Sequence, residues 1–329
     1  MNILIIGGTR FIGPHIVRAA AVRGHEITLF HRGQSVAEDL PEVRRCLGDR
    51  EVDLDRLDGE WDAVIDTCGY VPRVVGLSAD HLRDRVGRYL FVSSISAVGD
   101  LTVVGHDESA APGVLTDPTV ETIDGDTYGP LKAACEAVVQ EAFGDRATLV
   151  RPGLIVGPGD STDRYTYWPR RIARGGPILA PAPANTPTQV IDARDLASWM
   201  IRLLEGQQGG IFNGVGPVMG MGELIAATAR GLQETPELVW VDPDFLESQE
   251  VTAWADLPCW IPATNEQHSG MLTASNAKAL ETGLRTRPLQ DTAKDALAWF
   301  GRQNRDAHTG LSAEREASVL AEWYESRAR

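Results

Sequence analysis

The 329-residue chain has few cysteines, and none of them are paired at a metal-binding spacing. Cys46, Cys68, Cys135 and Cys259 lie far apart in the sequence, which argues against a zinc site or a disulfide framework and favours reduced thiols in a cytoplasmic protein. The seven histidines show neither an H-E-x-x-H nor an H-x-x-x-H spacing. We therefore expect no metal site.

Long hydrophobic runs are absent as well, and the chain starts with a strand-like segment rather than a basic and apolar leader. We expect neither a membrane span nor a secretory signal. The net charge of −15, from 46 acidic against 31 basic residues, repels phosphate backbones and anionic lipids. This charge argues against nucleic acid and membranes as partners.

What the chain does contain is a strand, a glycine turn and a helix within its first residues. Ile3 to Ile6 are apolar and indicate a buried parallel strand, which Gly7, Gly8 and Gly13 follow. Glycines let the backbone turn tightly and approach a pyrophosphate, and the amides of the next helix attract it. The predicted dinucleotide-binding turn consists of Gly7, Gly8, Thr9, Arg10, Phe11, Ile12 and Gly13.

Strand-like and helix-like segments alternate up to about residue 155. This alternation predicts an α/β fold with a parallel, doubly wound sheet of the Rossmann type. The expected strands are 3–6, 26–31, 43–47, 63–66, 88–93 and 148–151, and the expected helices between them include 71–83 and 128–143.

After residue 155, proline and glycine punctuate the chain, and helix-like segments follow at 195–204, 221–232, 291–300 and 312–325. We therefore predict a dinucleotide-binding domain at 1–155, to which 185–215 returns. The segments 156–184 and 216–329 are expected to form a smaller, loop-rich α+β substrate lobe over the carboxyl edge of the sheet, where open α/β sheets bind ligands.

Tyr128 and Lys132 are four residues apart and so lie on one face of an expected helix. An ammonium nearby favours the phenolate, which would let the phenol give or take a proton near pH 7. Ser94 and Ser96 follow the expected strand 88–93, at the carboxyl edge of the sheet, where a hydroxyl can stabilise negative charge on a substrate oxygen. Capping and turn hydrogen bonds are the structural alternative for these serines.

Together these segments resemble the short-chain dehydrogenase/reductase superfamily, in its extended branch of NAD(P)-dependent epimerases, dehydratases and reductases. The resemblance covers about 1–215 and includes the segments 151–160, 189–197 and 210–213. It implies that Tyr128 is the catalytic acid/base, that Lys132 holds the nicotinamide ribose and that Ser94 is the catalytic serine, with Ser96 as the reserve candidate. The glycine turn, with Arg10 in place of the middle glycine, resembles a divergent subgroup that includes chloroplast stem-loop RNA-binding proteins.

The cofactor choice depends on the end of the second strand. NAD binders usually place a carboxylate there for the ribose 2′-hydroxyl, whereas this chain has His31, Arg32 and Gly33. The guanidinium of Arg32 suits a 2′-phosphate, and Arg10 could approach the same group. We therefore predict NADP, with NAD as the alternative. The resemblance implies further cofactor contacts by Asp49, Cys68 and Pro152.

The implied reaction is hydride transfer to a carbonyl or imine carbon, with Tyr128 as the proton donor and Ser94 polarising the oxygen. Ile95 and Ser96 stand where related dehydratases carry an Asp-Glu pair, so dehydration is not expected. A sugar-nucleotide epimerase remains an alternative, as does a non-catalytic nucleotide-sensing or RNA-binding protein on the same scaffold. The predicted substrate contacts are Ser96, Tyr165 and Trp168, and the family makes a homodimer one option for assembly.

Overall fold

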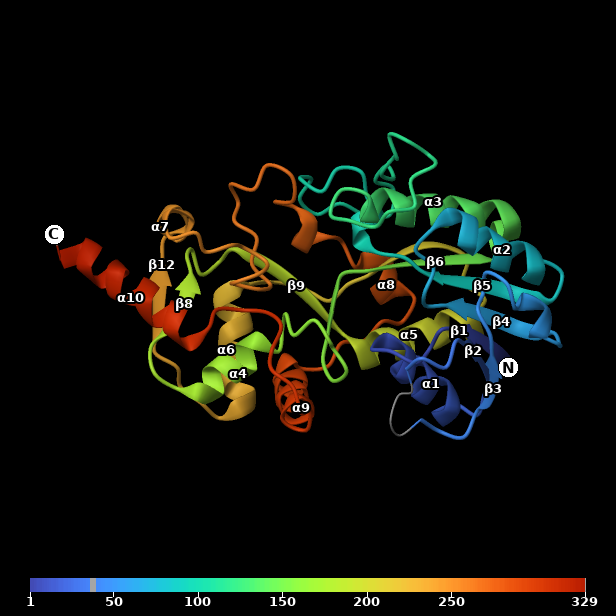
Figure 1. Ribbon diagram of the computed structural model, residues 1–329, viewed down its shortest axis with the longest axis horizontal. Helices are drawn as coiled ribbons and strands as arrows, with labels where there is room; N and C mark the ends of the chain where they lie inside the picture. Colours follow the sequence, from blue (N-terminus) through green and yellow to red (C-terminus); the bar gives the residue numbers. More distant parts are fainter. Residues whose placement is uncertain (36–39, 329) are drawn as a thin grey trace. The chain divides into compact units, whose positions relative to one another are not determined.

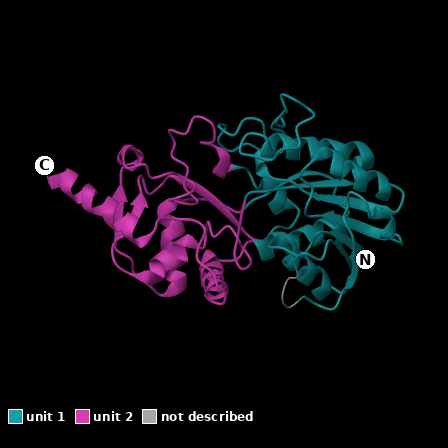
Figure 2. Cartoon of the chain, in the orientation of Figure 1, with its two compact units in different colours: residues 1–153, 193–215, 274–285 teal, residues 154–192, 216–273, 286–329 magenta. Residues whose placement is uncertain are grey.

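The computed structural model describes residues 1–35 and 40–328, which form two compact units (Figures 1 and 2). Unit 1 comprises 1–153, 193–215 and 274–285, and unit 2 comprises 154–192, 216–273 and 286–329. The returns to unit 1 at 193–215 and 274–285 differ from the predicted single return at 185–215, which puts 274–285 in the substrate lobe. This second return is fixed by side-chain contacts, since the Asn213 amide donates to the Ser275 carbonyl and the Trp199 indole donates to Thr282.

Unit 1 is built on a seven-stranded sheet in the order β10-β6-β5-β4-β1-β2-β3, in which neighbouring strands run parallel. The chain therefore starts in the middle of the sheet and winds outward in both directions, which confirms the predicted doubly wound fold. The strands are β1 (Asn2–Ile6), β2 (Glu26–His31), β3 (Arg44–Leu47), β4 (Trp61–Asp66), β5 (Val86–Val92), β6 (Ala147–Pro152) and β10 (Gly210–Gly214).

Helices cover both faces of this sheet (Figure 1). On one face α1 (Ile12–Val22) packs against α5 (Ala193–Glu205), and on the other α2 (Pro72–Leu82) packs against α3 (Tyr128–Phe143). The smaller helical elements of unit 1 are η1 (Leu54–Arg56), η2 (Ile95–Ala97), η3 (Gly144–Arg146) and α8 (Ala277–Glu281). The apolar core under α2 and α3 holds the parallel strands so that their carboxyl ends meet along one edge.

Unit 2 contains a three-stranded sheet, β11-β9-β7, and a two-stranded sheet, β12-β8. Its strands are β7 (Leu154–Val156), β8 (Ile178–Pro181), β9 (Pro187–Asp192), β11 (Val218–Gly220) and β12 (Leu238–Val241). Its helical elements are α4 (Tyr167–Arg174), α6 (Met221–Leu232), α7 (Pro243–Ser248), η4 (Met271–Thr273), α9 (Leu289–Gly301) and α10 (Ala313–Ala328). The strands and the helix within 154–184 leave no pattern in the sequence, because prolines and glycines interrupt apolar runs that are too short to show a period.

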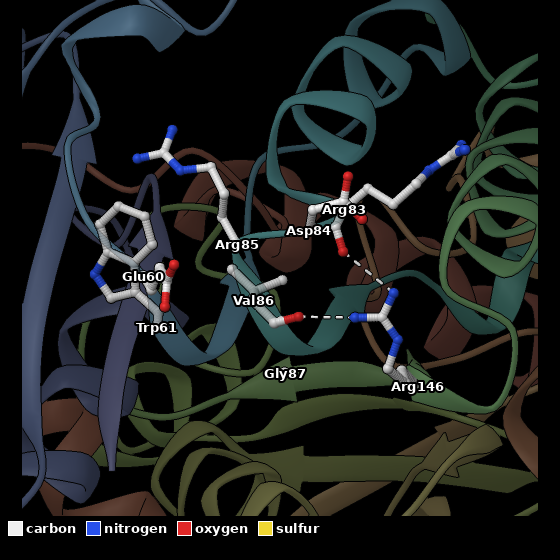
Figure 3. A pocket seen from close by; sticks show the side chains of 8 residues that line it. All are labelled: Glu60, Trp61, Arg83, Asp84, Arg85, Val86, Gly87 and Arg146. Atoms are coloured by element: carbon white, nitrogen blue, oxygen red, sulfur yellow. Dashed lines mark hydrogen bonds between the residues drawn. The ribbon is translucent and has the colours of Figure 1, made fainter.

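A shallow depression lies at the amino-terminal edge of the unit 1 sheet, where β4 and β5 begin (Figure 3). It is lined by Glu60, Trp61, Arg83, Asp84, Arg85, Val86, Gly87 and Arg146. Arg146 donates to the Val86 carbonyl, and Arg85 donates to the carbonyls of Leu57 and Gly59. These arginines close turns at the opposite end of the strands from the glycine turn, so we read the depression as structural.

Within the described residues, no helix is long and apolar enough to cross a membrane. Cys46, Cys68, Cys135 and Cys259 are free thiols. The same part of the chain shows no group of three or more His, Cys, Asp or Glu side chains that could hold a metal ion.

Candidate dinucleotide and reaction site

The glycine turn joins β1 to α1 with a backbone that larger residues rarely adopt. Gly7 and Gly8 have positive φ angles of 89° and 77°. A Cβ at Gly13 would lie 2.4 Å from the Gly8 carbonyl carbon, so the first turn of α1 packs directly on the backbone of the loop. The turn therefore needs glycine at each of these positions and leaves backbone close to the space where a ligand would approach.

The end of β4 supports this turn. The Gly8 amide donates to Thr67 Oγ1 at 3.0 Å, and Thr67 Oγ1 donates to the Ile6 carbonyl at 2.9 Å. A Cβ at Gly7 would lie 2.5 Å from Thr67 Oγ1 and 3.1 Å from the Cys68 sulfur. Cys68 therefore lies beside the turn, and burial, followed by the charge of Asp66 nearby, raises the pKa of its thiol to about 11.

Lys132 is 3% exposed and reaches the carboxyl ends of β4 and β5. Its Nζ donates to the carbonyls of Gly69 and Val92, both at 2.7 Å. The ring centroids of Phe91 and Tyr70 lie 4.5 and 5.0 Å from the same nitrogen. Burial lowers the pKa of Lys132 to about 8. Two of the three N–H groups of the ammonium thus donate to carbonyls of the described residues.

Tyr128 opens α3, one helical turn before Lys132, and the next residue presses onto η2. A Cβ at Gly129 would lie 2.2 Å from the Ser96 carbonyl oxygen. Ser94 is 8% exposed, and its Oγ accepts a hydrogen bond from the Ser96 amide at 3.1 Å, which caps η2. The structure thus brings the backbone that carries Ser94 and Ser96 against the backbone that carries Tyr128.

The loop between these two segments packs back on the site. Residues 98–127 separate η2 from α3. Within it, the Gly113 amide donates to the Ala97 carbonyl at 2.8 Å, and the Gly99 amide donates to the Ala111 carbonyl at 2.8 Å. This loop is therefore anchored beside η2 through residues 111–113, and it begins and ends beside the candidate catalytic residues.

Sequence reasoning missed a buried ion pair directly below this site. Both oxygens of Asp66, the last residue of β4, accept from Arg50 at 2.9 and 2.7 Å. Arg50 also donates to Ser78, and the Tyr89 hydroxyl donates to Asp66. Burial opposes ionisation of Asp66, but the charge of Arg50 and these hydrogen bonds lower its pKa. A single arginine in a polar turn gives no sequence signal for such a pairing.

At the end of β2, Arg32 is exposed, and its Nη1 lies 4.0 Å from Asp49 Oδ2. His31 is buried instead, and its Nδ1 accepts from the Gly33 amide at 3.0 Å. A neutral ring in that arrangement carries its proton on Nε2. Nε2 is buried without a partner among the described residues, and burial together with the charge of Arg45 lowers the pKa of His31. His31 is therefore a buried donor at the position where NAD binders usually have a carboxylate.

The remaining predicted site residues fall into different surroundings. Thr9 Oγ1 lies 3.1 Å from Ser35 Oγ, whereas Arg10 is exposed. Phe11 and Ile12 begin α1, and Pro152 ends β6 in the interior of unit 1.

Tyr165 and Trp168 are fully buried in the core of unit 2. The Tyr165 hydroxyl pairs with Thr228, and the Trp168 indole donates to the Pro258 carbonyl. Both side chains therefore have the surroundings of packing residues. The sequence shows that aromatic residues occur in this segment, but it does not distinguish a packing residue from a substrate contact. We therefore do not carry these two residues into the reaction site.

A parallel doubly wound sheet, a glycine turn after its first strand and a buried lysine one turn after a tyrosine define a dinucleotide-binding scaffold. Residues 73–214 match the family described as "NAD dependent epimerase/dehydratase family". This match covers less than half of the chain, and it agrees with the resemblance to the extended branch of the short-chain dehydrogenases/reductases that the sequence indicated.

The chain is also similar to two curated proteins and to solved structures. The chain is 28% identical to chloroplast stem-loop binding protein of 41 kDa b from Arabidopsis thaliana, over 74% of this chain and 66% of that protein. It is 31% identical to 2'-dehydrokanamycin reductase from Streptomyces kanamyceticus, over 58% of this chain and 52% of that protein. UDP-glucose 4-epimerase from Thermus thermophilus, solved with NAD, has a TM-score of 0.61 and 19% identity, over 92% of this chain and 99% of that one. The last likeness concerns the fold alone.

Proposed function

We propose that the protein is an NADP-dependent reductase of a carbonyl or imine group in a small-molecule substrate. The observation that carries the proposal is the position of Lys132, whose buried ammonium is fixed at the ends of β4 and β5, one helical turn after Tyr128. This is the arrangement in which an ammonium can hold a ribose and a phenol can move a proton. The likeness to a curated reductase supports the same reading.

The residues of unit 1 fit a nicotinamide dinucleotide. Gly7, Gly8 and Gly13 give a turn with no side chain between the backbone and a pyrophosphate, and α1 begins where its amides can receive the negative charge. The third N–H of Lys132 can donate to a ribose hydroxyl. When bound, the nicotinamide supplies a hydride to the substrate carbon.

The chain's own residues would divide the remaining work. Tyr128 gives its phenolic proton to the substrate oxygen, and the charge of Lys132 favours the phenolate that results. The hydroxyl of Ser94 donates a hydrogen bond to the same oxygen and stabilises its negative charge. The Ser96 amide already donates to Ser94 Oγ, so the Ser94 proton is free to point toward a substrate.

The preference for NADP rests on the end of β2. Arg32 is exposed there, and its ion pair among the described residues is a 4.0 Å contact with Asp49, so it can turn toward a 2′-phosphate. A 2′-phosphate can accept from this guanidinium, whereas a carboxylate for an unmodified ribose is missing at this position.

The proposal is tested by NADPH oxidation across a panel of small ketones, aldehydes and imines, with the wild type and Tyr128→Phe side by side. We expect turnover of at least one substrate by the wild type and a loss of about 100-fold or more in the variant. If the wild type oxidises NADPH with no member of a broad panel, the reductase proposal fails.

A sugar-nucleotide epimerase is the second candidate, because solved structures of such enzymes share the fold. An epimerase would interconvert UDP-sugars without net consumption of the cofactor. Incubation with UDP-glucose and UDP-galactose in separate reactions, followed by product separation, distinguishes the two. Turnover there without net NADPH oxidation would favour the epimerase.

The RNA-binding alternative has its own test, which the likeness to a chloroplast stem-loop binding protein motivates. A net charge of −15 disfavours RNA. Tight binding of a structured RNA at moderate salt, together with no turnover, would favour that alternative.

A further inference from the structure

Tyr70 lies in the short connection between β4 and α2, at the sheet edge that carries the candidate site. The residue is 44% exposed, although its ring lies over Lys132 Nζ at 5.0 Å. The proposed reaction assigns no role to this side chain. Burial, followed by the neighbouring Tyr128, raises the pKa of Tyr70.

A second ring contacts the same ammonium. Phe91 is fully buried, and its centroid lies 4.5 Å from Lys132 Nζ. Glycine at position 69 permits this approach, because a Cβ there would lie 2.5 Å from Cε2 of the Phe91 ring. Gly69 also supplies one of the two carbonyls that accept from Lys132. We call the rings of Tyr70 and Phe91 the aromatic clamp.

We propose that Tyr70 is a positioning residue, whose ring forms the outer wall of the aromatic clamp, holds the Lys132 ammonium on the carbonyls of Gly69 and Val92 and keeps bulk water from it. Tyr70 is the outer wall because it is partly exposed, whereas Phe91 is buried in the core. The inference rests on the proposed function, in which Lys132 holds the ribose. Tyr70 acts through Lys132 and needs no contact with the substrate.

The clamp has a consequence for the charge of Lys132. The groups that face it from β4 and α3 and raise its pKa are Cys135, Asp66, Cys68 and Glu136. Burial outweighs them and lowers the pKa of Lys132 to about 8. Removing the outer ring admits water, which raises this pKa toward the ordinary value of about 10.4. The lost cation–π contact acts in the opposite direction but is the smaller effect.

The charge of Lys132 can be measured directly, because the chain has only three lysines. We would label the protein with 13Cε-lysine, assign the signals with Lys278→Arg and Lys294→Arg, and titrate each by NMR. Lys132 is expected to titrate near 8 in the wild type and in Tyr70→Phe, which keeps the ring. In Tyr70→Leu we expect its midpoint to rise by about one pH unit or more.

Tyr70→Trp is the rescue variant, since it places an aromatic ring at position 70. We expect its Lys132 titration midpoint to lie close to that of the wild type. If Tyr70→Leu titrates like the wild type, or if the leucine and tryptophan variants titrate alike, the clamp is wrong. The NMR measurement requires no turnover, so a failed reductase assay leaves its outcome unaffected. Where turnover is found, the alkaline limb of kcat/KM should move with the Lys132 midpoint.

Discussion

Arg50 and Asp66 form a bidentate ion pair, with N–O distances of 2.9 and 2.7 Å, that is buried at the carboxyl end of the central strand β4. Asp66 lies two residues before Cys68, and the Cys68 amide donates to Asp66 Oδ1 at 3.1 Å. The segment that supports the glycine turn and supplies the Gly69 carbonyl is therefore tied to this pair.

Removing one charge of this pair should be costly. We expect Asp66→Asn to lower the free energy of unfolding by about 3–5 kcal/mol, because Arg50 is left buried without a counter-charge. Asp80→Asn, which breaks an exposed pair with Arg83, is the matched control and should cost less than about 1 kcal/mol. Urea unfolding measures both, and equal small losses would show that the buried pair is not structurally important.

The close contact at Gly13 predicts loss of cofactor binding on enlargement. Gly13→Ala places a methyl group 2.4 Å from the Gly8 carbonyl carbon, so α1 must move away from the turn. We expect at least about a tenfold weaker NADPH affinity by fluorescence titration. Gly301→Ala is the control, because nothing lies within 4 Å of a Cβ at that position. Unchanged affinity in Gly13→Ala would contradict the assignment of the turn.

Tyr128→Phe separates binding from chemistry. The variant lacks the proton donor but keeps the ring and Lys132, so turnover should fall by about 100-fold or more while NADPH affinity stays within about twofold. Tyr324→Phe, at an exposed position on α10, should leave both unchanged. Steady-state kinetics and fluorescence titration provide the readouts. Near-normal turnover in Tyr128→Phe would remove the phenol from the mechanism.

The depressed pKa of Lys132 predicts a pH limit on activity. Below its pKa of about 8 the ammonium is charged and can hold the ribose and favour the phenolate, and above that value it loses both capacities. We therefore expect kcat/KM to fall as the pH rises through about 8. A profile that stays flat up to about 10.4, the ordinary lysine pKa, would contradict this account.

Arg32 should set the cofactor preference. Arg32→Ala removes the exposed guanidinium at the end of β2, so NADPH affinity should fall by about tenfold while NADH affinity is unchanged. Arg44→Ala, at an exposed position on the neighbouring edge strand, is the control. Equal affinities for the two cofactors that neither variant alters would refute the 2′-phosphate contact.

Sequence alone predicted much of unit 1, because buried parallel strands and long helices leave strong periodic patterns. The helix 128–143 and the strand 26–31 have the bounds that the sequence indicated. In unit 2 the sequence does not predict the strands between β6 and α5. These strands have three to six residues and are separated by segments rich in proline and glycine.

The sequence likewise predicts only part of the candidate site. Tyr128, Lys132 and the glycines follow a local spacing that sequence reveals. Arg50 and Tyr70 gain their surroundings only through tertiary contacts, with Asp66 in one case and Lys132 in the other. Such long-range pairings leave no pattern in a single sequence, which is why they were missed.

The most direct test of the central claim is a crystal structure of the complex with NADP⁺. We predict the dinucleotide along the glycine turn, a Lys132 hydrogen bond to its nicotinamide ribose, and the Tyr128 and Ser94 hydroxyls both within about 3 Å of one substrate-oxygen position above the nicotinamide. A complex in which the Tyr128 hydroxyl points away from Ser94, or in which the dinucleotide lies elsewhere, would contradict the claim.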